Sequence, residues 1–78
     1  MKPALHRVEL QSTTLARAEY DAKGHQFVLD FRDGSRYRYS GVQAPIFVDL
    51  LRAPSQGAFF NREIRNRYPY VRISQSEN

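Results

Sequence analysis

The sequence predicts a small α+β domain, in which an antiparallel β-meander of three to four strands carries two short helices on one face and a short C-terminal strand. Two observations support this fold class. Apolar and polar residues alternate up to Ser40, as in strands with one buried face, and from Pro45 the apolar residues recur at helical spacing. With 78 residues the chain has room for a single core, which we expect over about residues 8–73, with a flexible tail at residues 74–78.

Three strands are expected before the first clear hairpin. Residues 8–11 alternate briefly. Residues 14–21 alternate so that one face receives Ala16, Ala18 and Tyr20. After a turn at residues 22–24, residues 26–32 place Phe27, Leu29 and Phe31 on one side, which predicts a half-buried strand.

The hairpin around Asp33-Gly34 determines which face the next strand presents. A two-residue turn would pair Phe31 with Arg36 and mix arginines into the apolar face. A three-residue loop, with Gly34 in the left-handed region, pairs Leu29 with Tyr37 and Phe27 with Tyr39, and leaves Asp30 across from Arg36. We favour the second register because it separates apolar from charged residues. Tyr37 and Tyr39 then belong to the core face, whereas the other register would make them an open platform for stacked bases.

Two helices follow Gly41. Pro45 suits a first helical position, and the apolar face of this helix comprises Ile46, Phe47, Leu50, Leu51 and Ala53. Pro54 ends it, and Ser55 is the expected N-cap of a second helix that runs to about Tyr68. On the second helix Glu63 and Arg67 are four residues apart and are expected to pair.

That pairing leaves Arg62 and Arg65 without a local partner, so they form either a phosphate-facing surface or an ordinary solvated helix face. Phe59 falls near the polar side of the same helix. It is either an exposed stacking anchor or, as we favour, a residue covered by the segment after Pro69.

Several classes of function have no support in the sequence. The chain contains no cysteine, so disulfides, thiolate metal sites and cysteine nucleophiles are excluded. His6 and His25 are far apart, and neither lies in a catalytic motif, so we expect no enzyme, no cofactor and no metal. The first residues lack the apolar stretch of a secretory signal, and no apolar run is long enough to span a bilayer, which favours a cytoplasmic location.

Positive charge is concentrated in the second half of the chain. Residues 1–35 carry five basic and five acidic side chains, whereas residues 36–78 carry seven basic and three acidic ones. Ten of the twelve basic residues are arginine, whose planar guanidinium suits phosphate and stacks on bases. This excess favours a polyanionic partner.

An ordered set of short motifs extends over roughly residues 12–73. It comprises Asp33-Gly34, Tyr37-x-Tyr39, Gly41-Val42, Leu51-x-Ala53, Ser55-x-Gly57 and Phe60-Asn61. Together these motifs resemble the KTSC domain, a module found at the C-terminus of some lysyl-tRNA synthetases and as stand-alone bacterial proteins. The resemblance implies family motif residues at Tyr37, Tyr39, Ser55, Gly57, Phe60 and Asn61. It implies no catalytic residues, and RNA binding is suggested by the attachment to a tRNA enzyme.

The leading hypothesis from the sequence is therefore a non-enzymatic module that binds RNA, with tRNA as one candidate. Its expected contact residues are Arg36, Arg38, Arg62, Arg65, Arg72, Tyr37 and Tyr39. The rival hypothesis is a protein–protein interaction module, either an adaptor or a homo-oligomer, that uses an open sheet face or an edge strand. Val28 on the expected outer face is the sequence feature that favours the rival.

Overall fold

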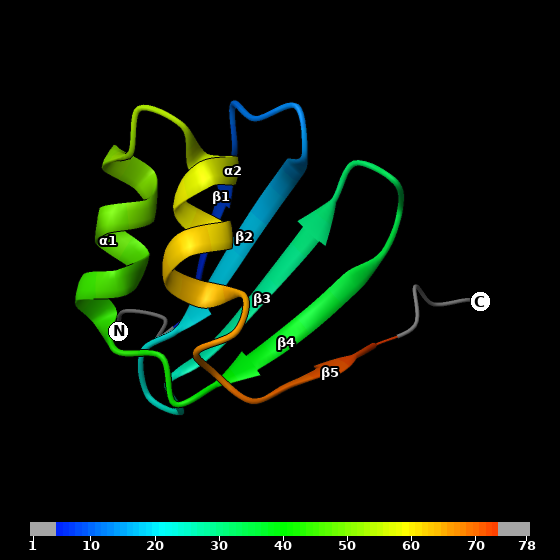
Figure 1. The fold of residues 1–78 in the computed structure, drawn as a ribbon. Helices are drawn as coiled ribbons and strands as arrows, with labels where there is room; N and C mark the ends of the chain where they lie inside the picture. The colour runs from blue at the N-terminus through cyan, green and yellow to red at the C-terminus, as the bar shows by residue number, and fades with distance from the viewer. Residues whose placement is uncertain (1–4, 74–78) are drawn as a thin grey trace.

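The computed structural model describes residues 5–73, and within this range five strands form one antiparallel sheet with the helices on one face (Figure 1). The strands are β1 (Leu5–Glu9), β2 (Leu15–Asp21), β3 (Gln26–Phe31), β4 (Arg36–Ser40) and β5 (Tyr70–Arg72). The helical segments are α1 (Ala44–Arg52), α2 (Gln56–Phe59) and the π-helical η1 (Phe60–Ile64). The order in the sheet is β1-β2-β3-β4-β5, the same as along the chain. The α+β prediction is confirmed, and the segment after Pro69 is a fifth paired strand.

The β3–β4 hairpin adopts the register that separates apolar from charged residues. Phe31 N–H donates to the Ser35 carbonyl at 2.9 Å, which closes a three-residue loop, and Gly34 has φ +96°. Leu29 faces Tyr37, and Asp30 faces Arg36. The left-handed position requires glycine because a Cβ there is strained, so the loop length follows from the place of Gly34 in the sequence.

A bulge in β2 changes the face predicted for Ala16. Leu15 pairs with Phe31 and Arg17 with Asp30, so Ala16 is an additional residue on this strand. Leu15 and Ala18 are fully buried in the core, while Ala16 lines a shallow hollow on the opposite face beside Arg17. The prediction that Ala16 shares the inward face with Ala18 is therefore wrong, because the bulge moves the alternation by one residue.

The two helices begin close to the predicted residues, but the second has different geometry. Ser55 caps α2 by accepting a hydrogen bond from Ala58 N–H at 3.2 Å, as predicted. The helix then widens into η1 and ends at Ile64 rather than near Tyr68. Arg65 N–H donates to the Phe60 carbonyl, five residues back, at 2.9 Å. The wider turn brings Phe59 and Phe60 together with Ile64 into the core.

The core lies between the helices and the sheet face that they cover. Its buried members come from β2, β3, β4, the helical segments and two connections, and they are Leu10, Leu15, Ala18, Tyr20, Phe27, Leu29, Tyr39, Val42, Phe47, Leu50, Phe59, Phe60 and Ile64. Phe59 is buried, so it is not an exposed stacking anchor. The segment after Pro69, which was expected to cover Phe59, pairs with β4 instead.

The predicted tail at residues 74–78 lies outside the described residues. Within residues 5–73, no helix is long and apolar enough to cross a membrane.

Candidate nucleic-acid interface

Five aromatic side chains form a closed ring on the helix-facing side of β3, β4 and β5. Phe31 contacts Tyr37 with ring centroids 5.6 Å apart, and Tyr37 contacts Tyr70 at 5.7 Å. Tyr70 contacts Tyr39 at 5.6 Å, Tyr39 contacts Phe60 at 5.9 Å, and Phe60 returns to Phe31 at 5.3 Å. Four of these contacts are edge-to-face, an arrangement that aromatic pairs favour, so the ring is a packed unit.

The ring lines a groove of about 530 Å³ that we call the aromatic groove. Its polar lining comes from the β1–β2 connection, the β3–β4 loop and the end of the second helix, and consists of Thr14, Asp33, Ser35, Asn61, Arg65 and Asn66. The volume lies within the range of ligand sites, about 300–1,000 Å³. The groove therefore combines flat apolar walls with several hydrogen-bonding groups, one cation (Arg65) and one carboxylate (Asp33).

The π-helical turn positions the polar wall of the aromatic groove. Asn61 and Arg65 both line it, and Arg65 Nη1 donates to Asn61 Oδ1 at 3.4 Å. On the β3–β4 loop, Asp33 Oδ1 accepts hydrogen bonds from Ser35 N and Oγ at 2.9 and 2.7 Å, which lower the pKa of Asp33. Extra turns of this kind are often found at functional sites because they redirect side chains.

Tyr39 is the most deeply buried phenol of the groove, with 3% of its surface exposed. Among the described residues, no group is in position to form a hydrogen bond with its hydroxyl, whereas the Tyr20 hydroxyl donates to the Val42 carbonyl at 2.7 Å. Burial raises the pKa of Tyr39 to about 12, with smaller contributions from Tyr37 and Tyr70. Arg65 opposes this increase because its positive charge favours a phenolate.

We expect the free energy of unfolding to fall as the pH rises from about 10 to about 12. Over this range folded Tyr39 keeps its proton, whereas the unfolded chain releases it near pH 10, so proton loss favours unfolding. One such group contributes at most about 1.4 kcal/mol per pH unit. Urea unfolding at about pH 9, 10 and 11 would measure the decline.

Tyr39→Phe is the matched variant for this measurement. It should lose less stability than the wild type over the same range, while keeping the decline due to Tyr20, whose pKa burial also raises. Equal losses in the two proteins would contradict the assignment to Tyr39.

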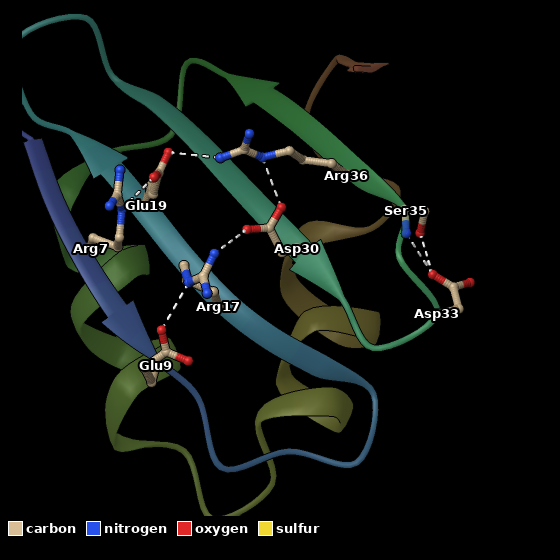
Figure 2. Close-up of polar contacts among 8 residues, drawn as sticks. All are labelled: Arg7, Glu9, Arg17, Glu19, Asp30, Asp33, Ser35 and Arg36. Carbon is tan, nitrogen blue, oxygen red and sulfur yellow. Dashed lines mark hydrogen bonds and ion pairs between the residues drawn. The ribbon is translucent and has the colours of Figure 1, made fainter. Parts of the chain in front are cut away.

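The opposite face of the sheet carries a chain of alternating charges, which we call the charge ladder (Figure 2). It runs Glu9–Arg17–Asp30–Arg36–Glu19–Arg7, with successive N–O distances of 2.9, 3.5, 2.8, 3.3 and 2.6 Å. Three arginines and three carboxylates alternate, so the ladder has no net charge. Arg36 lies between two carboxylates, and its charge is already compensated.

A family model decides the classification of the chain: the KTSC domain model matches residues 11–68. The chain belongs to the KTSC family. A KTSC domain protein of Yersinia pestis has the same fold, with a TM-score of 0.86 at 25% identity, and the match covers 91% of this chain and 100% of that one.

KTSC relatives include stand-alone proteins and a part of a larger one. An uncharacterised protein of Stutzerimonas stutzeri is 36% identical over 70 residues, 88% of this chain and 99% of the relative. A protein of Tsukamurella paurometabola is 33% identical, over 82% of this chain and 96% of its own. A lysine–tRNA ligase of Nostoc punctiforme is 28% identical over 82% of this chain, which matches 11% of that protein.

The KTSC motif residues divide between the groove and the helix start. Tyr37, Tyr39, Phe60 and Asn61 all line the aromatic groove. Ser55 caps α2, so the Ser-x-Gly element has a structural role. The remaining motif residue is Gly57, where an added Cβ would lie 3.7 Å from the hydroxyls of Ser12 and Thr14, an ordinary contact distance.

The structure brings together four of the seven residues that the sequence assigned to RNA contact. Tyr37, Tyr39 and Arg65 line the aromatic groove, and the Arg72 guanidinium lies 5.9 Å from the centroid of the Tyr37 ring. The other three residues, Arg36, Arg38 and Arg62, lie elsewhere.

Each of these three residues has a different setting. Arg36 belongs to the charge ladder, and Arg38 pairs in the sheet with Val28 and Val71. Arg62 binds Glu63 at 3.1 Å and lies over the Phe59 ring. The predicted Glu63–Arg67 pair is wrong, because the π-turn removes the four-residue spacing, and Arg67 Nε donates to the Arg62 carbonyl instead.

Sequence reasoning did not identify six of the groove residues: Thr14, Phe31, Asp33, Ser35, Asn66 and Tyr70. Tyr70 could have been found, since Tyr70-Val71-Arg72 alternates as Tyr37-Arg38-Tyr39 does, and pairing the two segments places their aromatic residues on one face. Within the described residues, no group of three or more His, Asp or Glu side chains could hold a metal ion.

Proposed function

We propose that this KTSC protein is a non-enzymatic module that binds single-stranded RNA through the aromatic groove together with Arg65 and Arg72. The observation that carries the proposal is the aromatic ring itself, in which Tyr70 is 56% exposed and Tyr37 is half-buried. Proteins hold unpaired bases by stacking them on such side chains and contact the adjoining phosphates with arginine.

The distribution of charge supports the same face. The ladder arginines are compensated by carboxylates on the opposite side of the sheet. Arg65 has a neutral hydrogen-bond partner, Asn61, and Arg72 lies over a neutral ring. Arg72 also interacts with the Asp33 carboxylate, so the two arginines exceed the one carboxylate at the groove by a single positive charge, where a phosphate backbone would pass.

A relative supports RNA as the class of nucleic acid. The Nostoc punctiforme protein is a lysine–tRNA ligase, and it contains a segment similar to this chain. We therefore choose tRNA as the first RNA to test, and a tRNA partner would place the protein in the cytoplasm.

The test is a titration of the ¹⁵N-labelled protein with bulk tRNA at low and then moderate salt. We expect amide shifts at Tyr37, Asn61, Arg65 and Tyr70, and an affinity that decreases as salt releases counterions. The double variant Arg65→Gln/Arg72→Gln should weaken binding at least about tenfold and reduce the slope of log affinity against log salt by about 1.5.

The control for this experiment is a variant that removes two positive charges away from the aromatic groove. Arg38 lies on the outer sheet face and Arg52 at the end of α1. Arg38→Gln/Arg52→Gln should weaken binding much less than the groove variant does. Equal weakening by the two variants would contradict the groove assignment, and absence of any shift with excess tRNA at low salt would refute RNA binding.

A second candidate, a protein–protein interaction module, is favoured by the edges of the sheet. β1 and β5 are edge strands, and Leu5, Tyr70 and Val71 on them are about half exposed. Such an edge can pair with a strand of an adaptor partner or of a second copy. Sedimentation equilibrium distinguishes the homo-oligomer: a protein that stays monomeric at high concentration rules it out.

A further inference from the structure

We propose that the aromatic groove holds one unstacked nucleotide, with its base against the ring of five aromatic side chains, an edge of that base hydrogen-bonded to the Tyr39 hydroxyl, and its phosphate beside Arg65. The inference rests on the proposed RNA function and specifies which part of the RNA enters the site.

The unpartnered Tyr39 hydroxyl is the first observation behind this inference. The hydroxyl of the other buried tyrosine of the sheet, Tyr20, donates to the Val42 carbonyl, whereas the Tyr39 hydroxyl opens to the groove. Tyr39 lines the groove with 3% of its surface exposed, and among residues 5–73 nothing bonds its hydroxyl. A ligand that offers a hydrogen-bonding edge at the floor of the groove would satisfy it.

The shape of the groove is the second observation. Its walls are the faces and edges of flat rings from β3, β4, β5 and η1, and its volume of about 530 Å³ falls within the range for small-ligand sites. A planar heteroaromatic base combines ring surface with donors and acceptors along its edges. It thus matches a site that has aromatic walls and a hydroxyl at its floor.

The charged side chains at the groove favour a ligand with negative charge. Aromatic rings also surround quaternary ammonium groups in cation-binding cages. Here Arg65 and the Asp33 carboxylate line the same groove, and the Arg72 guanidinium lies over Tyr37. Two positive charges therefore face one negative charge, and the net positive charge disfavours a cationic ligand. Asn61 holds Arg65 at the wall by a 3.4 Å hydrogen bond. An anionic group attached to the base fits this position.

The experiment uses the whole protein and four small probes: AMP, UMP, ribose 5-phosphate and choline. Binding is followed by amide shifts and by tyrosine fluorescence, since the chain contains no tryptophan. We expect AMP or UMP to shift the amides of Tyr37, Tyr39, Asn61 and Arg65. Ribose 5-phosphate, which lacks the base, should bind at least about tenfold more weakly because it loses the stacking, and choline should not bind.

Two variants test the roles of the groove residues. Tyr39→Phe should weaken nucleotide binding about three- to tenfold, the value of one hydrogen bond, and should change the ratio of the AMP and UMP affinities. Tyr70→Ala truncates a half-exposed side chain outside the buried core, and should weaken both nucleotides about tenfold. Tyr20→Phe removes a hydroxyl outside the groove and should leave nucleotide binding unchanged.

The outcomes separate this inference from the RNA function on which it rests. If tRNA binds but nucleotides do not shift the groove amides, or if Tyr39→Phe leaves both affinities unchanged, the nucleotide site is refuted and RNA binding stands. If neither tRNA nor nucleotides bind, both proposals fail. If choline binds as well as AMP, the groove is a cation site and the inference is overturned.

Discussion

Replacing Asp30 by alanine is expected to lower the free energy of unfolding by about 2–3 kcal/mol. Asp30 lies in the middle of the charge ladder, with 14% of its side chain exposed and Arg17 and Arg36 on either side. Its Oδ1 lies 2.8 Å from Arg36 Nε; both atoms are buried, and they form an ion pair without the alignment of a hydrogen bond. Removing one partner of a buried pair costs about 3–5 kcal/mol, and the 32% exposure of Arg36 reduces this value.

A double-mutant cycle in urea would measure the effect. Adding Arg36→Met to Asp30→Ala should recover about half of the loss, because the uncompensated guanidinium is gone and an apolar side chain covers the strand. The control is Glu63→Ala, which removes an exposed partner of Arg62 and should cost less than about 1 kcal/mol. A loss from Asp30→Ala no greater than that of the control would show that the ladder does not stabilise the sheet.

The second large effect concerns two buried tyrosines that differ in their hydrogen bonding. Tyr20→Phe should lower the free energy of unfolding by about 1–2 kcal/mol, because it leaves the buried Val42 carbonyl without its 2.7 Å donor. Tyr39→Phe should leave the free energy of unfolding unchanged or slightly higher, because its hydroxyl has no partner within the described chain. Urea unfolding of the two variants at pH 7, without nucleic acid, makes the comparison.

Comparing the two variants distinguishes a hydroxyl that stabilises the fold from one that is available to a ligand. The Tyr39 hydroxyl opens to the aromatic groove and has no hydrogen-bond partner among residues 5–73, so we expect a neutral Tyr39→Phe together with reduced nucleotide binding. If Tyr39→Phe destabilised the protein as much as Tyr20→Phe does, the Tyr39 hydroxyl would have a structural partner and would not be available to a ligand.

Local patterns were sufficient to predict most of the fold. Alternation placed the strands, Ser55 marked the second helix, and Gly34 fixed the hairpin loop, because each of these signals lies within a few neighbouring residues. The bulge at Ala16 and the π-turn after Phe59 were not predictable in this way. Both insert one residue into a regular element so that distant apolar side chains can meet, and that benefit appears only in the assembled core.

Only part of the candidate site was predicted, again because the sequence shows local patterns and not contacts between distant segments. Charge and composition selected the arginines, but they could not distinguish Arg36, which is neutralised by carboxylates from β2 and β3, from Arg65, whose bonded partner is an amide. The tyrosines of β4 were identified by their alternation. Their neighbours Phe31 and Phe60 looked like ordinary core residues, since a groove is formed by the meeting of three strands and a helix.

The position of β5 determines when the groove can exist during folding. The first four strands each pair with the next strand along the chain, so they can associate through short loop closures. β5 pairs with β4 only after residues 41–69 have folded back across the sheet, and its three exposed residues form three pairs. Short, exposed edge strands of this kind open locally before the core unfolds. Release of β5 would carry Tyr70 away and open the ring, so binding would be lost while the rest of the domain stayed folded.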